Sequence, residues 1–184
     1  MQRAAFLDRD GVVNREVGYL HRWADFEFLP GVLDAMRALH RAGYALFIVT
    51  NQSGIARGYY SEADYQALTA QLRQALSDAG CPATAIYHCP HHPAGTVAEF
   101  AVDCGCRKPR PGMLMQAQRE WGLDMAGSIM VGDKAADAEA GRTAGVGRVF
   151  LVRSGHALEP GAEQLADAVH ADLAACVSAL GLRA

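Results

Sequence analysis

The sequence lacks a long apolar run, an excess of charge of either sign and a block of basic residues. Its longest apolar run, Tyr44–Val49, is far too short to span a bilayer. The chain passes from Met1-Gln2-Arg3 into a strand pattern with acidic residues by position 8, which is not the pattern of a secretory signal peptide. A net charge of −3 gives no reason to expect a nucleic-acid partner. We therefore expect a cytoplasmic protein that binds neither membranes nor nucleic acid.

Cysteine is also scarce, and its number and placement do not suit a disulfide framework. The chain has five cysteines, an odd number, which favours metal binding or free thiols. An apolar content of 51% with 20% charged residues is typical of a globular protein. A length of 184 residues fits one domain with a sizeable core. We expect a single domain over residues 1–184 that acts as a monomer.

Strand-like and helix-like segments alternate along the whole chain. The expected strands cover residues 3–7, 44–49, 85–87, 128–131 and 148–152, and the expected helices cover 31–41, 61–79, 111–121, 135–144 and 163–180. Such alternation predicts an α/β fold, a doubly wound parallel sheet with helices on both faces. Two irregular stretches, 11–30 and 88–110, are long enough to be functional loops.

Short runs of polar residues, here called polar strings, lie beyond the carboxyl ends of the expected strands. Ligands bind at this place in sheets of this kind. Three of them follow the first, second and fourth expected strands, and another ends the long loop after the third. These strings are Asp8-Arg9-Asp10-Gly11, Thr50-Asn51-Gln52-Ser53-Gly54, Gly132-Asp133 and Arg107-Lys108-Pro109. Each string alone has a plainer explanation as a turn, a helix cap or a solvated surface charge. Their order, each after a strand or at the end of its loop, favours one common site.

The first string suits phosphoryl transfer. Asp8 and Asp10 lie two residues apart, so a strand sends both side chains to the same side, where their repulsion calls for a cation. Asp8 can act as the nucleophile that forms an aspartyl phosphate, and Asp10 can act as general acid and base. Mg²⁺ prefers oxygen ligands, which Asp8, Asp133 and the Asp10 carbonyl can supply.

The other polar strings supply groups that can bind the phosphoryl oxygens and a cation that can balance the carboxylates. Thr50 and the backbone amides near Asn51 can bind the transferring phosphoryl oxygens. Lys108 can offset the negative charge of Asp8 and of the phosphoryl group. Asp137 lies one helical turn beyond Asp133, where it can hold Lys108 or a metal-bound water.

Four residues of the second irregular stretch suggest a zinc site. Cys89, His91, Cys104 and Cys106 form a Cys₃His set, the composition of a closed structural Zn²⁺ site. Their spacings are tighter than those of zinc fingers, and the alternative is three free thiols beside an exposed histidine pair. Chemistry alone does not choose His91 over His92. Because Cys106 directly precedes Arg107-Lys108, a metal here would also fix where those two cations point.

Taken together, the four strings resemble the motifs of the haloacid-dehalogenase superfamily of phosphatases. The resemblance implies a Rossmann-like core, with Asp8 as nucleophile and Asp10 as acid and base. It further implies that Thr50 and Lys108 bind the phosphoryl group, and that Asp8 and Asp133 bind Mg²⁺. The intervals between the motifs leave no room for a large cap domain, so the site is expected to be open.

The cysteine pattern resembles one branch of that superfamily, which includes the heptose bisphosphate 7-phosphatases and the histidinol-phosphate phosphatases. Strings at 18–21, 50–58, 89–93, 106–113 and 130–134 resemble the heptose family, and the similarity runs from about residue 4 to 153. The resemblance implies that Arg107 and Lys134 contact the substrate and that the turn 16–19 lines the pocket. The candidate substrate-binding residues are Glu16, Val17, Gly18, Tyr19, Asn51, Gln52, Ser53, Arg107 and Lys134.

The resemblance therefore implies a Mg²⁺-dependent phosphatase that removes the 7-phosphate of D-glycero-D-manno-heptose 1,7-bisphosphate, for lipopolysaccharide synthesis, and that carries structural Zn²⁺. The preferred anomer stays open. One alternative is a histidinol-phosphate phosphatase or another phosphatase of small phosphosugars. An alternative of another class is a non-catalytic phosphosugar-binding protein, and the complete set of Asp8, Asp10, Lys108 and Asp133 argues against it.

Overall fold

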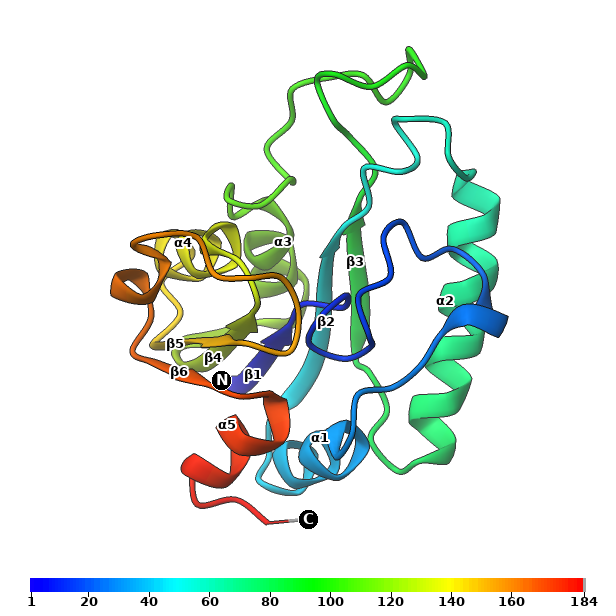
Figure 1. The fold of residues 1–184 in the computed structure, drawn as a ribbon. Coiled ribbons are helices and arrows are strands. Elements are labelled where there is room, and N and C mark those ends of the chain that lie inside the picture. The colour runs from blue at the N-terminus through cyan, green and yellow to red at the C-terminus, as the bar shows by residue number, and fades with distance from the viewer. Residues whose placement is uncertain (184) are drawn as a thin grey trace.

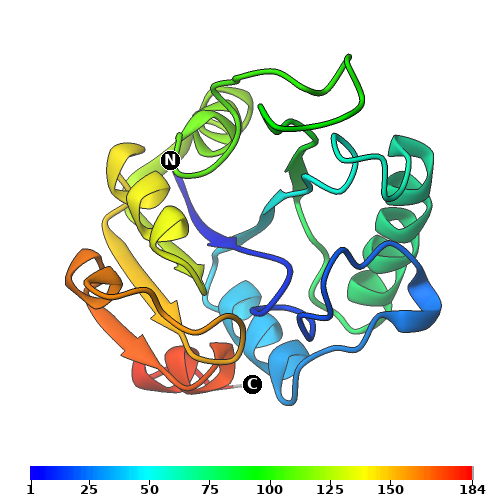
Figure 2. The same ribbon diagram turned by 45° about the horizontal axis from the view of Figure 1, so that its top comes forward.

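A computed structural model describes residues 1–183 and centres on one six-stranded sheet (Figures 1 and 2). The strands lie in the order β3-β2-β1-β4-β5-β6, and every neighbouring pair is parallel. Their bounds are β1 Gln2–Leu7, β2 Ala45–Asn51, β3 Ala85–Cys89, β4 Leu123–Gly132, β5 Arg148–Val152 and β6 Ala168–His170.

Five α-helices connect or follow these strands: α1 Val32–Arg41, α2 Glu62–Asp78, α3 Gly112–Trp121, α4 Ala135–Thr143 and α5 Leu173–Ala179. Two short 3₁₀ helices cover Trp23–Asp25 and Ala162–Leu165. The start of α2 shows why a helix forms there: the Ser61 side chain accepts from the Asp64 backbone, and the Asp64 carboxylate accepts from the Ser61 backbone. Among the helices within residues 1–183, none combines the length and the apolar character that crossing a membrane requires.

The sheet is covered on both faces, because alternate residues of a strand point to opposite sides. In β1, Ala5 and Leu7 belong to the core that includes α1 and α5, whereas Ala4 and Phe6 belong to the core that includes α3 and α4. Leu72 of α2 joins the first of these cores. The doubly wound parallel sheet predicted from the sequence is therefore confirmed.

Strand order reverses between β1 and β4. From β1 the chain adds β2 and β3 on one side, and it then returns to place β4, β5 and β6 on the other side. The backbone N–H of Asp8 donates to the carbonyl of Val131 at 3.0 Å, so the two strands end together. A reversal of this kind opens a crevice at the carboxyl ends of the strands, which is where ligands bind in such folds.

The predicted closing helix over residues 163–180 is wrong. The structure has the 3₁₀ helix Ala162–Leu165, then the edge strand β6, and only then α5. Asp172 begins this last helix, because its side chain accepts from the backbone N–H of Ala175 at 2.8 Å. Ala168–His170, which precede Asp172, pair with β5 as a strand instead of continuing a helix.

Residues 89–106, here called the cysteine loop, lie over the carboxyl end of the sheet. In Figure 1 this green segment rises at the top beside the cyan segment that follows β2. The two segments are joined, because the backbone N–H groups of Thr96 and Val97 both donate to the carbonyl of Ala56, at 2.8 and 2.9 Å. The cysteine loop therefore helps to shape the region where the polar strings meet.

Candidate active site

Asp8, Asp133 and Lys108 meet where the strand order reverses. Asp8 directly follows β1, Asp133 directly follows β4, and Lys108 lies just beyond the cysteine loop. Lys108 Nζ donates to Asp8 Oδ1 at 2.8 Å, although the two residues are 100 positions apart in the sequence. All three residues are buried. The structure thus brings together the residues that the sequence nominated for phosphoryl transfer.

Lys108 is held by three acceptors. Its Nζ also donates to the carbonyl of Val49 at 2.7 Å and lies 2.6 Å from Asp137 Oδ1. Burial alone would lower the pKa of Lys108, but the charges of Asp137 and Asp8 outweigh it and raise the pKa above its ordinary value. The ammonium group is therefore a fixed positive charge beside Asp8.

Asp8 itself is costly to ionise in this setting. Burial raises its pKa well above the ordinary value, Lys108 opposes that shift, and Asp137 and Asp133 add to it. One lysine thus does not balance three neighbouring carboxylates. A divalent cation would supply the missing positive charge.

Asp133 is the carboxylate best placed to bind such a cation. Its Oδ2 accepts from His156, while its Oδ1 is buried and has no hydrogen-bond partner within residues 1–183. Asp8, Asp133 and Asp137 each offer an oxygen within 4.8 Å of the others. Both oxygens of Asp137 are already engaged, however: Oδ1 by Lys108, and Oδ2 by the backbone N–H groups of Asp133 and Lys134. Asp8 and Asp133 therefore fit Mg²⁺, and Asp137 holds Lys108 in place.

Asp10 has a partner that the sequence reasoning did not anticipate. Arg9 is 1% exposed, and its Nε and Nη2 donate to the two oxygens of Asp10 at 3.2 and 3.0 Å. Asn14 and Gln52 donate to the same carboxylate at 3.0 and 3.1 Å. These donors fix the position of the Asp10 carboxylate at the pocket wall.

The last residues of β2 and those that follow it form a connected polar network. Gln52 Nε2 donates to Thr50 Oγ1 at 2.8 Å, and the Tyr60 hydroxyl donates to Gln52 Oε1. The Asn51 side chain clamps the backbone of Lys108, with Nδ2 donating to its carbonyl and Oδ1 accepting its N–H, both at 3.0 Å. Asn51 therefore fixes the position of Lys108 from the sheet.

A cavity of about 340 Å³ opens above these groups. Of the turn 16–19, Glu16, Gly18 and Tyr19 line it, whereas the Val17 side chain is exposed and does not line it. Tyr19 adopts a positive φ of 51°, uncommon for a residue other than glycine. The lining residues named from the sequence are Asp8, Asp10, Glu16, Gly18, Tyr19, Thr50, Asn51, Gln52, Ser53, Arg107, Lys108, Lys134 and Asp137.

Besides Lys108, three cations line this cavity, namely Arg57, Arg107 and Lys134. Within the part of the chain that the structure describes, none of them forms a salt bridge with a carboxylate. Arg57 Nε and Arg107 Nη1 are buried there without a hydrogen-bond partner. Guanidinium groups with N–H groups left unpaired in this way suit an anionic group of the ligand.

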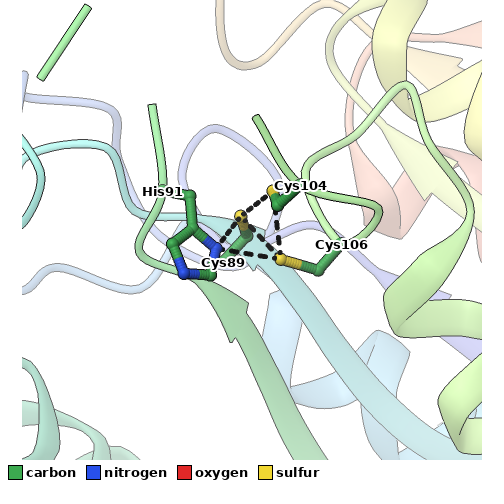
Figure 3. Close-up of side chains that lie close together, drawn as sticks. All are labelled: Cys89, His91, Cys104 and Cys106. Carbon is green, nitrogen blue, oxygen red and sulfur yellow. Dashed lines mark hydrogen bonds between the residues drawn. The ribbon is translucent and has the colours of Figure 1, made fainter. Parts of the chain in front are cut away.

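The predicted zinc ligands converge in the cysteine loop (Figure 3). The sulfur atoms of Cys89, Cys104 and Cys106 lie 3.0 to 3.4 Å apart, and His91 Nδ1 lies 3.3 Å from the sulfur of Cys106. The hydrogen bond between Cys106 and Cys89 lowers the pKa of Cys106 to about 5, burial opposes this shift, and His91 adds to it. Three sulfur atoms and one imidazole nitrogen that converge in this way fit a tetrahedral Zn²⁺ site.

His91, rather than His92, completes this cluster. His92 turns to the neighbouring segment, where its Nε2 lies 3.2 Å from Nη2 of Arg57. The cysteine loop thereby contacts a cation of the cavity wall. The other two cysteines, Cys81 and Cys176, are buried in the apolar core.

The residues of this site that sequence reasoning missed include Arg9, Arg57, Tyr60 and His156. A signal existed for His156, because Arg153-Ser154-Gly155-His156 is a polar string directly after β5. A search for polar residues directly after each strand, as was made for the other strands, would have found His156. No comparable signal marked Arg9, whose burial arises only from tertiary packing.

Comparison with known proteins finds similarity to phosphatases, in agreement with the chemistry of the site. A family model described as HAD-hydrolase-like matches residues 105–176. A D-glycero-beta-D-manno-heptose-1,7-bisphosphate 7-phosphatase of Escherichia coli is 51% identical over 171 residues, covering 93% of this chain and 90% of that protein. A D-glycero-alpha-D-manno-heptose-1,7-bisphosphate 7-phosphatase of Photorhabdus laumondii is 50% identical over 154 residues, covering 84% of each chain. The D,D-heptose 1,7-bisphosphate phosphatase from B. bronchiseptica, crystallised with magnesium and phosphate, matches with a TM-score of 0.80 at 34% identity and covers 97% of both chains.

Proposed function

Because the chain belongs to the heptose-1,7-bisphosphate 7-phosphatase family of HAD-like hydrolases, we propose that it releases the 7-phosphate of D-glycero-D-manno-heptose 1,7-bisphosphate through an aspartyl phosphate on Asp8. It is a phosphoric monoester hydrolase. One observation carries the assignment of residues: Lys108 Nζ joins Asp8 to Asp137 beside an unpartnered oxygen of Asp133, where strand order reverses.

In the first step, an oxygen of Asp8 attacks the phosphorus atom and the bond to the leaving sugar oxygen breaks. Asp8 Oδ1 accepts from Lys108 Nζ at 2.8 Å, so the ammonium group lies beside the attacking carboxylate. Asp10 gives a proton to the leaving alkoxide. In the second step Asp10 takes a proton from water, the hydroxide cleaves the aspartyl phosphate, and inorganic phosphate leaves.

The surrounding residues stabilise the charge of the transferring group. Thr50 and the backbone after β2 bind its oxygens, and Lys108 lies beside the attacking carboxylate. Asp8 and Asp133, with the Asp10 carbonyl, would hold Mg²⁺, which supplies charge neutralisation and keeps Asp8 ionised. Because all these groups come from one sheet and its loops, we further propose that residues 1–184 act as a single phosphatase domain.

The non-reacting phosphate has its own partners in this proposal. Arg107 and Lys134 line the cavity without a carboxylate partner, and both are additional to the groups that bind the transferring phosphate. The open site without a large cap suits a small phosphosugar that carries two phosphates. The cytoplasmic location and monomeric state expected from the sequence stay predictions.

The experiment that tests this function is a kinetic screen of phosphorylated sugars. We expect kcat/KM for heptose 1,7-bisphosphate, measured for the α and β anomers separately, to exceed that for histidinol phosphate by about 10²-fold or more, because the unpaired cations need the second phosphate. Comparable or higher kcat/KM for histidinol phosphate would overturn the choice of substrate. Absence of turnover on all of them would instead favour a binding protein.

Replacing Arg107 should weaken recognition of the second phosphate. For Arg107→Met we expect KM for the bisphosphate to rise roughly 10- to 100-fold with a much smaller change in kcat, because one charge-assisted contact is lost. The matched control is Arg41→Met at an exposed position of α1. A heptose 7-monophosphate should show no such rise, and an equal rise on the monophosphate would exclude this role.

A further inference from the structure

His156 connects the segment after β5 to the carboxylate of Asp133. Its backbone N–H and its ring Nδ1 both lie 2.7 Å from the same oxygen, Asp133 Oδ2. A carboxylate oxygen can only accept when it is ionised, so Nδ1 is the nitrogen that carries the hydrogen. Two donors from one residue thus converge on one oxygen of Asp133.

That oxygen has no room to move. A Cβ atom built on Gly155 would lie 2.0 Å from Asp133 Oδ2, and one on Gly11 would lie 2.5 Å from it. The carboxylate therefore packs directly against two glycine backbones, one after β1 and one after β5. Ser154 Oγ joins the same two segments by donating to the carbonyl of Gly11 at 2.7 Å.

The other oxygen of Asp133 is left bare. Oδ1 is buried and has no hydrogen-bond partner within residues 1–183, although the residue is 0% exposed. An ionised oxygen buried without any donor is unfavourable unless a cation binds it. The arrangement of Oδ2 therefore decides which oxygen is offered to a cation.

We propose that His156 is a positioning residue for the divalent cation: by holding Oδ2 with its ring, it keeps Oδ1 of Asp133 directed to the metal. This inference rests on the proposed Mg²⁺-dependent reaction. The Nε2 atom of the ring lies 4.0 Å from Glu16 Oε2 at the wall of the cavity. Hydrogen-bond partners of metal ligands commonly contribute 10- to 100-fold to metal affinity.

Two substitutions separate the ring donor from the backbone donor. His156→Ala keeps the backbone N–H and removes Nδ1, whereas the side-chain amide of His156→Asn can place an N–H where Nδ1 stood. We would measure the Kd for Mg²⁺ by calorimetry on the zinc-loaded protein without substrate. We expect a 10- to 100-fold higher Kd for His156→Ala and a Kd close to that of the unmodified protein for His156→Asn.

The controls make a general loss of structure visible. His40→Asn, at an exposed position of α1, should leave the Kd for Mg²⁺ unchanged. The circular dichroism and melting temperature without Mg²⁺ should also be the same in all variants, since the His156 side chain is 41% exposed. An unchanged Kd in His156→Ala, or a Kd in His156→Asn as high as in His156→Ala, would overturn the proposal. A failure of the proposed reaction is a separate result, because Mg²⁺ affinity is measured without substrate.

Discussion

Replacing Asp8 by asparagine should lower kcat by a factor of about 10⁴ or more while the protein stays folded. The loss follows because an amide cannot form the aspartyl phosphate, and removing a covalent nucleophile has effects of this size. The fold should persist, because the asparagine oxygen can still accept from Lys108, which also keeps Val49 and Asp137 as acceptors. In addition, the substitution removes a buried carboxylate whose pKa is raised by burial.

The measurement has two parts. Steady-state turnover of the bisphosphate gives kcat, and rapid quenching followed by intact mass analysis detects the phosphorylated enzyme. We expect the phosphoryl adduct in the unmodified protein and in the control Asp34→Asn, whose side chain is 61% exposed on α1, but not in Asp8→Asn. Turnover that survives in Asp8→Asn, or an adduct that maps to another residue, would show that Asp8 is not the nucleophile.

Removal of zinc should have the second-largest effect, a loss of kcat/KM on the order of 10²-fold. Cys106 is a candidate Zn²⁺ ligand and directly precedes Arg107 and Lys108, so a metal bound there would fix the backbone that carries both cations. Misplacement of such groups by about an ångström is known to cost rates of this order. The backbone of Lys108 is also clamped by Asn51, so we expect KM to change more than kcat.

The zinc experiment compares variants of known metal content. Cys106→Ser and chelator-treated protein should both show loss of zinc by elemental analysis, faster proteolysis in the cysteine loop and lower kcat/KM. His92→Asn is the matched control for metal content, because His92 lies outside the cluster and should leave zinc bound. Full activity in protein verified to be free of zinc would show that the metal does not position the cations.

The strands of the fold could be predicted because each is a compact apolar run that ends in polar residues. This pattern located β1 and β5 within one residue, and it placed Asp8 and Asp133 at the ends of their strands. The edge strand β6 was not predicted, because its three residues are only half-buried and their pattern is also compatible with a helix. Short edge strands take their structure from their neighbour rather than from their own pattern.

Residues that support the site by holding another side chain were harder to predict from the sequence than the residues expected to take part in the reaction. Asp8 and Lys108 are recognisable, because carboxylates and a lysine after strands suggest chemistry by themselves. Arg9 looks like a surface charge in the sequence, and only the structure shows it buried against Asp10. Arg57 likewise depends on the fold, since its contact with His92 joins two loops that are distant in the sequence.

The chain has only two lysines, Lys108 and Lys134, and both line the cavity. Lys108 has its three N–H groups engaged and its pKa raised, so it offers no lone pair to an acylating reagent. Lys134 is exposed at the cavity wall. Lys134 is therefore the one lysine that can react with such a reagent, and it lies at the wall of the ligand cavity. The only amine outside the two lysines is the α-amino group of Met1. Covalent labelling of the Lys134 amine would report directly on whether the cavity is occupied.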